Sequence, residues 1–209
     1  LFMCRIYILM MSLPPLIFSI YKVIQMNDAA GLVFSQSGAS YDLVAFTKGI
    51  RKTNRKVIAL TNQPESPEED VAHLTLPINA GVERAVLATK SVIGSIAAGM
   101  WLLTAFAPTY RDYAENASAP MRHLAQTNFT ALAELRFALQ RAYHVQFARR
   151  GTGFGAAQEA ALKLNKTMVL LAEAYPAAKV LHGPLQLAKN ALYVLLLNTG
   201  EPEKQDRLD

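Results

Sequence analysis

Ser35-Gln36-Ser37-Gly38-Ala39-Ser40 is the stretch on which the fold prediction depends. It follows an apolar run at 32–34 and precedes residues 42–52, where apolar side chains recur at helical spacing, so we predict a turn from a strand into a helix. Backbone N–H groups at the start of a helix lack helical partners, and Gly38 lets the chain approach a ligand closely. With three serine hydroxyls, the turn is suited to bind a phosphate. A second interpretation stays open, in which Ser40 only caps the helix and the other serines fill a polar loop.

The composition is that of a globular protein. The chain has 209 residues, of which 52% are hydrophobic and 18% are charged, which is enough for one large or two small domains. A formal net charge of +5 favours anionic partners, but the basic residues form no block with interleaved aromatic residues. We therefore predict a phosphorylated metabolite as partner and no nucleic acid. The single cysteine, Cys4, leaves no disulfide or zinc motif, which suits a cytoplasmic protein without a structural metal.

The first 21 residues form an almost wholly apolar segment with one charge, Arg5. Pro14-Pro15 interrupts the segment, which leaves an apolar run shorter than the roughly 20 residues that a membrane helix needs. No small-residue cleavage site follows, as a signal peptide would require. We therefore predict no membrane insertion. A chain that begins with Leu is interpreted as a fragment or as the product of a misassigned start.

Strand and helix patterns alternate along the rest of the chain. Strands are predicted at 32–34, 56–62, 73–78, 144–148 and 191–198, and helices at 42–52, from 66, at about 85–106 and at about 156–168. Residues 108–142 are predicted to form one or two connecting helices. The glycines at 151–155 do not have the three-glycine spacing of a dinucleotide site. The sequence thus predicts an α/β fold in which a second unit repeats the first.

Five motifs in order resemble those of the double sugar isomerase (SIS) domain proteins. They are the serine turn at 35–40, Ala-Gly-Val-Glu-Arg-Ala-Val-Leu-Ala-Thr-Lys at 80–90, Gln-Glu-Ala-Ala-Leu-Lys-Leu at 158–164, Ala-Glu-Ala-Tyr at 172–175 and His-Gly-Pro at 182–184. The similarity covers residues 12–198. Within this family, the chain most resembles the isomerising glucosamine-6-phosphate deaminases, and the isomerase half of glutamine–fructose-6-phosphate aminotransferase is a near relative.

The resemblance implies a fold and a set of partners. Two flavodoxin-like α/β subdomains with parallel sheets are expected at 1–107 and 143–209, both incomplete, with connecting helices at 108–142. The first would lack its N-terminal strand and turn, and the second would be truncated at its C-terminus. A homodimer and a sugar-phosphate ligand, glucosamine 6-phosphate or fructose 6-phosphate, are implied. No metal and no organic cofactor are implied.

The resemblance also assigns roles to individual residues. It places the sugar against Val86 and Ala88, and the phosphate against Ser35, Gln36, Ser37, Gly38 and Ser40. His182 would open the sugar ring by moving a proton between the ring oxygen and the anomeric hydroxyl. Lys163 would add positive charge near the developing enediolate. For these two residues the alternatives are a histidine at a helix end and a solvated lysine.

The sequence also departs from the family pattern. Lys166 stands where the family has a carboxylate that moves a proton between C1 and C2, and an ammonium group is a poor general base. Two functions are therefore open: an isomerase or deaminase acting on an amino-sugar phosphate, and a catalytically impaired sugar-phosphate-binding module or fragment. A sugar-phosphate-sensing transcription regulator would need a basic helix-turn-helix region before residue 35, which the apolar N-terminal segment does not provide.

Overall fold

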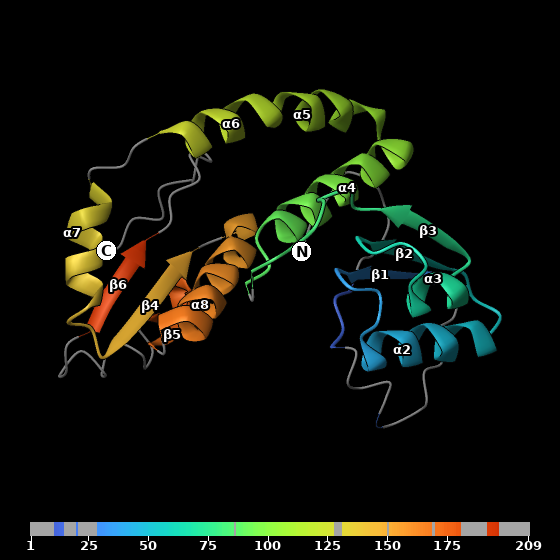
Figure 1. The fold of residues 1–209 in the computed structure, drawn as a ribbon, viewed down its shortest axis with the longest axis horizontal. Helices are drawn as coiled ribbons and strands as arrows, with labels where there is room; N and C mark the ends of the chain where they lie inside the picture. Colours follow the sequence, from blue (N-terminus) through green and yellow to red (C-terminus); the bar gives the residue numbers. More distant parts are fainter. Residues whose placement is uncertain are drawn as a thin grey trace. The chain divides into compact units, whose positions relative to one another are not determined.

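The chain divides into two compact units, with the boundary between Gln126 and Thr127. A computed structural model describes residues 11–14, 20, 29–85, 87–127, 131–149, 151–168, 170–180 and 192–196. Figure 1 shows the helices and strands of each unit. The boundary falls inside the predicted connecting segment 108–142, and the subdomain limits at 107 and 143 stay a prediction. Most of the apolar segment 1–21 lies outside the described residues.

The first unit is built on a parallel sheet in the order β1-β2-β3. Its strands are β1 (Gly31–Ser35), β2 (Val57–Thr61) and β3 (Leu74–Pro77). Its helices are α2 (Tyr41–Lys52), α3 (Pro67–Val71), α4 (Lys90–Phe106), the 3-10 helix η1 (Pro108–Tyr110), α5 (Arg111–Asn116) and α6 (Ser118–Gln126). The parallel α/β fold predicted from the short apolar runs is confirmed. The parallel pairing requires a crossover between strands, which α2 supplies between β1 and β2.

The two faces of this sheet are covered by different helices, with α2 and α3 on one side and α4 on the other (Figure 1). Alternate residues of a strand point to opposite faces, so Val33 packs with Ile50 of α2, and Phe34 lies on the α4 side. A Cβ added to Gly99 of α4 would lie 3.3 Å from the Phe34 ring. The glycine therefore lets α4 approach the sheet closely.

The second unit has a parallel sheet in the order β5-β4-β6. Its elements are α7 (Ala131–Leu139), β4 (His144–Arg149), the 3-10 helix η2 (Gly151–Gly153), α8 (Phe154–Met168), β5 (Leu171–Pro176), α9 (Ala177–Val180) and β6 (Leu192–Leu196). Small side chains bring α8 onto the sheet, because Ala157 and Ala161 are buried against Val145 and Phe147 of β4. The second α/β unit predicted from the sequence is thus confirmed.

Three details differ from the sequence prediction. Strand β5 was not predicted, since Ala-Glu-Ala-Tyr lacks the β-branched run that indicates a buried strand. Helix α4 begins at Lys90 and not near 85, and the Glu83 side chain accepts hydrogen bonds from the Thr89 and Ser91 N–H groups at this start. The connecting segment contains α5, α6 and α7 in place of one or two helices. Within the described ranges, no helix has both the length and the apolar character needed to cross a bilayer.

Candidate functional site: the serine turn at the sheet edge

The serine turn leaves β1 at the edge where the parallel strands of the first sheet end. The register pairs Ser35 with Thr61 of β2, and Thr61 with Pro77 of β3, so the three carboxyl ends lie side by side. Ligands of open α/β sheets bind at this edge. The predicted position of the turn at the carboxyl edge is confirmed.

Two serine hydroxyls shape the turn from inside. Ser35 Oγ accepts a hydrogen bond of 3.0 Å from the Gly38 N–H, and Ser37 Oγ accepts one of 3.2 Å from the Ala39 N–H. Gly38 has a φ of +61°, which a residue without a Cβ adopts readily. Ser35 is buried, whereas Gln36, Ser37 and Ser40 are exposed. Each hydroxyl keeps its own proton, which it can donate to an anion.

Helix α2 begins directly after the turn and adds a favourable electrostatic field. Ser40 occupies the N-cap position with an extended backbone, and its carbonyl accepts a bond of 3.0 Å from the Val44 N–H. Among the described residues its side chain makes no capping hydrogen bond, which argues against the interpretation of Ser40 as only a cap. The first N–H groups of a 12-residue helix favour an anion. Asp42 in the first turn already supplies one negative charge.

Asn62, just after β2, joins the serine turn to the loop that follows β3. Its N–H donates to the Gln36 carbonyl at 3.2 Å. Its side-chain Nδ2 donates to the Gly81 carbonyl at 2.8 Å, and its Oδ1 accepts from the Ala80 N–H at 2.8 Å. One residue therefore holds two loops at the sheet edge. The sequence analysis did not identify Asn62, and its position at the end of a predicted strand was the available signal.

Glu83 fixes the other end of the same loop by capping α4. Its Oε2 accepts hydrogen bonds from the Ser91 N–H at 3.0 Å, the Ser91 hydroxyl at 2.9 Å and the Thr89 N–H at 3.1 Å. These bonds, led by the one from the Ser91 N–H, lower the pKa of Glu83 to about 2. Ala88 is half-buried within the segment held in this way, and Val86 lies outside the described residues.

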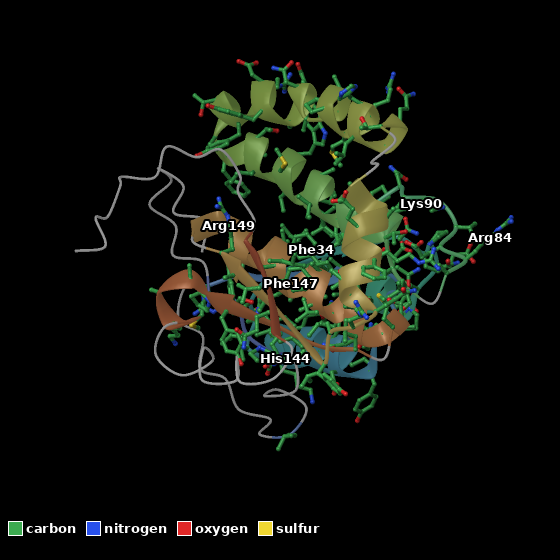
Figure 2. All side chains as sticks on the ribbon, turned by 90° about the vertical axis from the view of Figure 1, so that its left-hand side faces the viewer. Phe34, Arg84, Lys90, His144, Phe147 and Arg149 are labelled. Atoms are coloured by element: carbon green, nitrogen blue, oxygen red, sulfur yellow. The ribbon has the colours of Figure 1, made fainter. Side chains whose placement is uncertain are left out.

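The loop between β3 and α4 and the start of α4 carry two basic side chains that point in different directions. Lys90 turns back to donate to the Val82 carbonyl at 2.7 Å. Arg84 is exposed and extends away from its loop (Figure 2). Arg84 is therefore the cation of this loop that points into solvent.

The predicted catalytic residues of the second unit are only partly described. Lys163 lies on α8, is half-buried and forms an ion pair with Glu159 one helical turn earlier. Lys166, also on α8, is exposed. His182 lies outside the described residues. In the parts of the chain that the structure describes, no three His, Cys, Asp or Glu side chains gather as a metal site would require.

A polar cluster that the sequence analysis did not identify lies on the second sheet. His144 Nε2 is 2.9 Å from Glu173 Oε2, a contact with the distance of an ion pair but without hydrogen-bond geometry. The Tyr175 hydroxyl donates to the same oxygen at 2.9 Å, which raises the pKa of Tyr175. Glu173 and Tyr175 belong to the Ala-Glu-Ala-Tyr motif at 172–175. The two side chains of this motif therefore contact each other, and Glu173 also contacts His144 of β4.

Comparison with known proteins places this geometry in a family. No family model matches the chain. Glutamine–fructose-6-phosphate aminotransferase of Campylobacter jejuni is 32% identical over 180 residues, which are 82% of this chain and 30% of that protein. A solved structure from Silicibacter pomeroyi DSS-3, provisionally named a phosphosugar isomerase, is 33% identical with a TM-score of 0.82, over 91% of this chain and 58% of that one. The chain belongs to the sugar isomerase (SIS) domain family.

The SIS fold is also found in a more distant solved structure. Glucosamine-6-phosphate deaminase of Thermotoga maritima is 21% identical with a TM-score of 0.64, over 92% of this chain and 60% of that one, and this likeness concerns the fold alone. The chain spans about a third of the length of the curated relatives it matches. The family and fold predicted from the five motifs are confirmed.

Proposed function

We propose that this SIS-family chain binds a sugar phosphate, with the phosphate group on the turn at 35–40. The observation that carries the proposal is the exposure of Ser37 and Ser40 at the start of α2, on the carboxyl edge of a parallel sheet. Hydroxyls and helical N–H groups there offer several donors to one anion. The names of the relatives, an aminotransferase acting on fructose 6-phosphate and a phosphosugar isomerase, support this ligand class.

We further propose that the reaction is an aldose–ketose isomerisation coupled to deamination, of the glucosamine 6-phosphate to fructose 6-phosphate type, in which water replaces the amino group and ammonia is released. His182 would open the ring, and Lys163 would place positive charge near the enediolate. Lys163 lies half-buried on α8 beside Glu159, so the positive charge that it would bring to the enediolate is shared with this carboxylate. Val86 and Ala88 would line the sugar, and the active form would be a homodimer.

Binding without turnover is a second candidate, and Lys166 favours it. Its exposed ammonium group stands where the resembling proteins have a carboxylate, and a cationic group cannot accept a proton from carbon. The two candidates share the phosphate site and differ in the proton transfer.

An assay of both products tests these proposals together. Purified chain is incubated with glucosamine 6-phosphate, and fructose 6-phosphate and ammonia are measured separately. Fructose 6-phosphate with equimolar ammonia indicates a deaminase, whereas calorimetric binding without either product indicates a binding module. Absence of binding to either sugar phosphate would refute the proposal.

A further inference from the structure

Glu68, the second residue of α3, is a buried carboxyl group behind the serine turn. It is fully buried, as is Thr47 of α2, whose hydroxyl donates to Glu68 Oε1. Glu68 Oε2 has no hydrogen-bond partner among the described residues. Burying a carboxyl group is unfavourable unless something compensates for its lost hydration. The protein therefore retains a carboxyl group whose burial is unfavourable. The one described hydrogen bond of this side chain joins α3 to α2.

The same residue contacts the turn through its backbone. The Glu68 N–H donates to the Gly38 carbonyl at 2.8 Å. Ser66, just before α3, lies so close to Gly38 that a Cβ added there would be 2.2 Å from Ser66 Oγ. A helix of five residues is not stable by itself, so the place of α3 depends on its tertiary contacts. The contact between Glu68 and Thr47 is such a contact, and it lies directly behind the turn.

We propose that Glu68 is a positioning residue, which with Thr47 holds α3 against Gly38 and so fixes the turn in its anion-binding conformation. The identity of the anion rests on the sugar-phosphate function proposed above, whereas the positioning of the turn does not. The Glu68 side chain acts through the turn and touches no substrate.

Burial raises the pKa of Glu68, and the bond from Thr47 opposes this shift. A neutral side chain of the same shape therefore fits the site, and glutamine is the conservative replacement. Alanine removes the contact with α2, and Thr47→Val removes the donor while keeping the shape of the residue. Asp70→Ala is the matched control on the same helix, because Asp70 is exposed, whereas Glu69 accepts a hydrogen bond of 2.7 Å from the Glu65 N–H beside the start of α3.

The test measures the turn itself and its ligand. Amide hydrogen exchange of residues 35–40 without ligand reports the order of the turn. Thr47→Val and Glu68→Ala are expected to speed this exchange, to weaken fructose 6-phosphate binding about tenfold, and to raise KM without lowering kcat. Glu68→Gln is expected to stay within about threefold of the wild type, and the control Asp70→Ala is expected to match the wild type in both exchange and binding.

Wild-type exchange at 35–40 in Thr47→Val and Glu68→Ala would overturn the proposal. If Glu68→Ala does not fold, Thr47→Val alone decides. If the wild type binds no sugar phosphate but the exchange changes as expected, the proposed ligand is wrong and the positioning role stands. If the wild type binds and neither variant alters the turn, the positioning role is wrong and the ligand stands.

Discussion

Replacing Gly38 with alanine should destabilise the first unit strongly, for two reasons that the structure separates. Its φ of +61° costs an L-residue about 1 to 2 kcal/mol. The new Cβ would also lie 2.2 Å from Ser66 Oγ and 2.4 Å from Ser66 Cβ, and overpacking of this kind costs about 1 to 3 kcal/mol. The sum is a loss of about 2 to 5 kcal/mol in the free energy of unfolding.

Urea denaturation followed by circular dichroism and by fluorescence of Trp101, the only tryptophan, measures this loss. Gly49→Ala is the matched control, because nothing lies within 4 Å of a Cβ on this helical glycine, and alanine should stabilise the helix by up to about 1 kcal/mol. Ser66→Gly should recover the packing part in the double variant, with a coupling energy of about 1 to 3 kcal/mol. A Gly38→Ala protein as stable as Gly49→Ala would refute the reasoning.

Three further predictions concern the edge of the first sheet and the second unit. The pKa of Glu83 falls from 4.5 to about 2 on folding, so its contribution to stability should be complete above pH 4.5 and be lost as the pH falls towards 2. Denaturation between pH 2 and 6 should show a flatter profile for Glu83→Gln than for the control Glu115→Gln, and equal profiles would contradict the capping role. Asn62→Ala should lower the free energy of unfolding by about 1 to 3 kcal/mol, because it removes two hydrogen bonds of 2.8 Å. A similar loss in the control Gln63→Ala, an exposed residue, would count against this account. Lys166→Glu should raise any residual isomerase rate and leave sugar-phosphate affinity nearly unchanged, and an equal gain in Lys179→Glu would argue against a specific role.

The sequence was sufficient to predict the elements that local patterns determine. The apolar runs before Ser35 and before Asn62 identified β1 and β2, and Ser66-Pro67 identified the start of α3. The role of Glu68 could not be predicted, because an acidic residue in a first helical turn is ordinarily solvated, and only the packing of α3 on α2 buries it. The fold was thus more predictable than the contacts that support its site.

The contacts at the sheet edge could not be predicted either, because they also depend on tertiary structure. Asn62 contacts a loop 18 and 19 residues further along the chain, and Glu83 accepts hydrogen bonds across a loop of irregular backbone. Such contacts depend on where the loops lie and not on any local pattern. The predicted phosphate residues, by contrast, lie in one continuous turn, so the sequence was enough to place them together.

The most direct test of the phosphate site is the affinity of Ser40→Ala for fructose 6-phosphate. Among the described residues the Ser40 side chain makes no capping bond, so its removal should change the free energy of unfolding by less than about 0.5 kcal/mol. A hydroxyl that donates to a charged phosphate contributes about 1.5 to 3 kcal/mol, so calorimetry should show affinity falling by about one to two orders of magnitude. Ser118→Ala, an exposed serine of α6, is the control and should bind like the wild type. A stable Ser40→Ala protein with wild-type affinity would contradict the assignment of the phosphate to this turn.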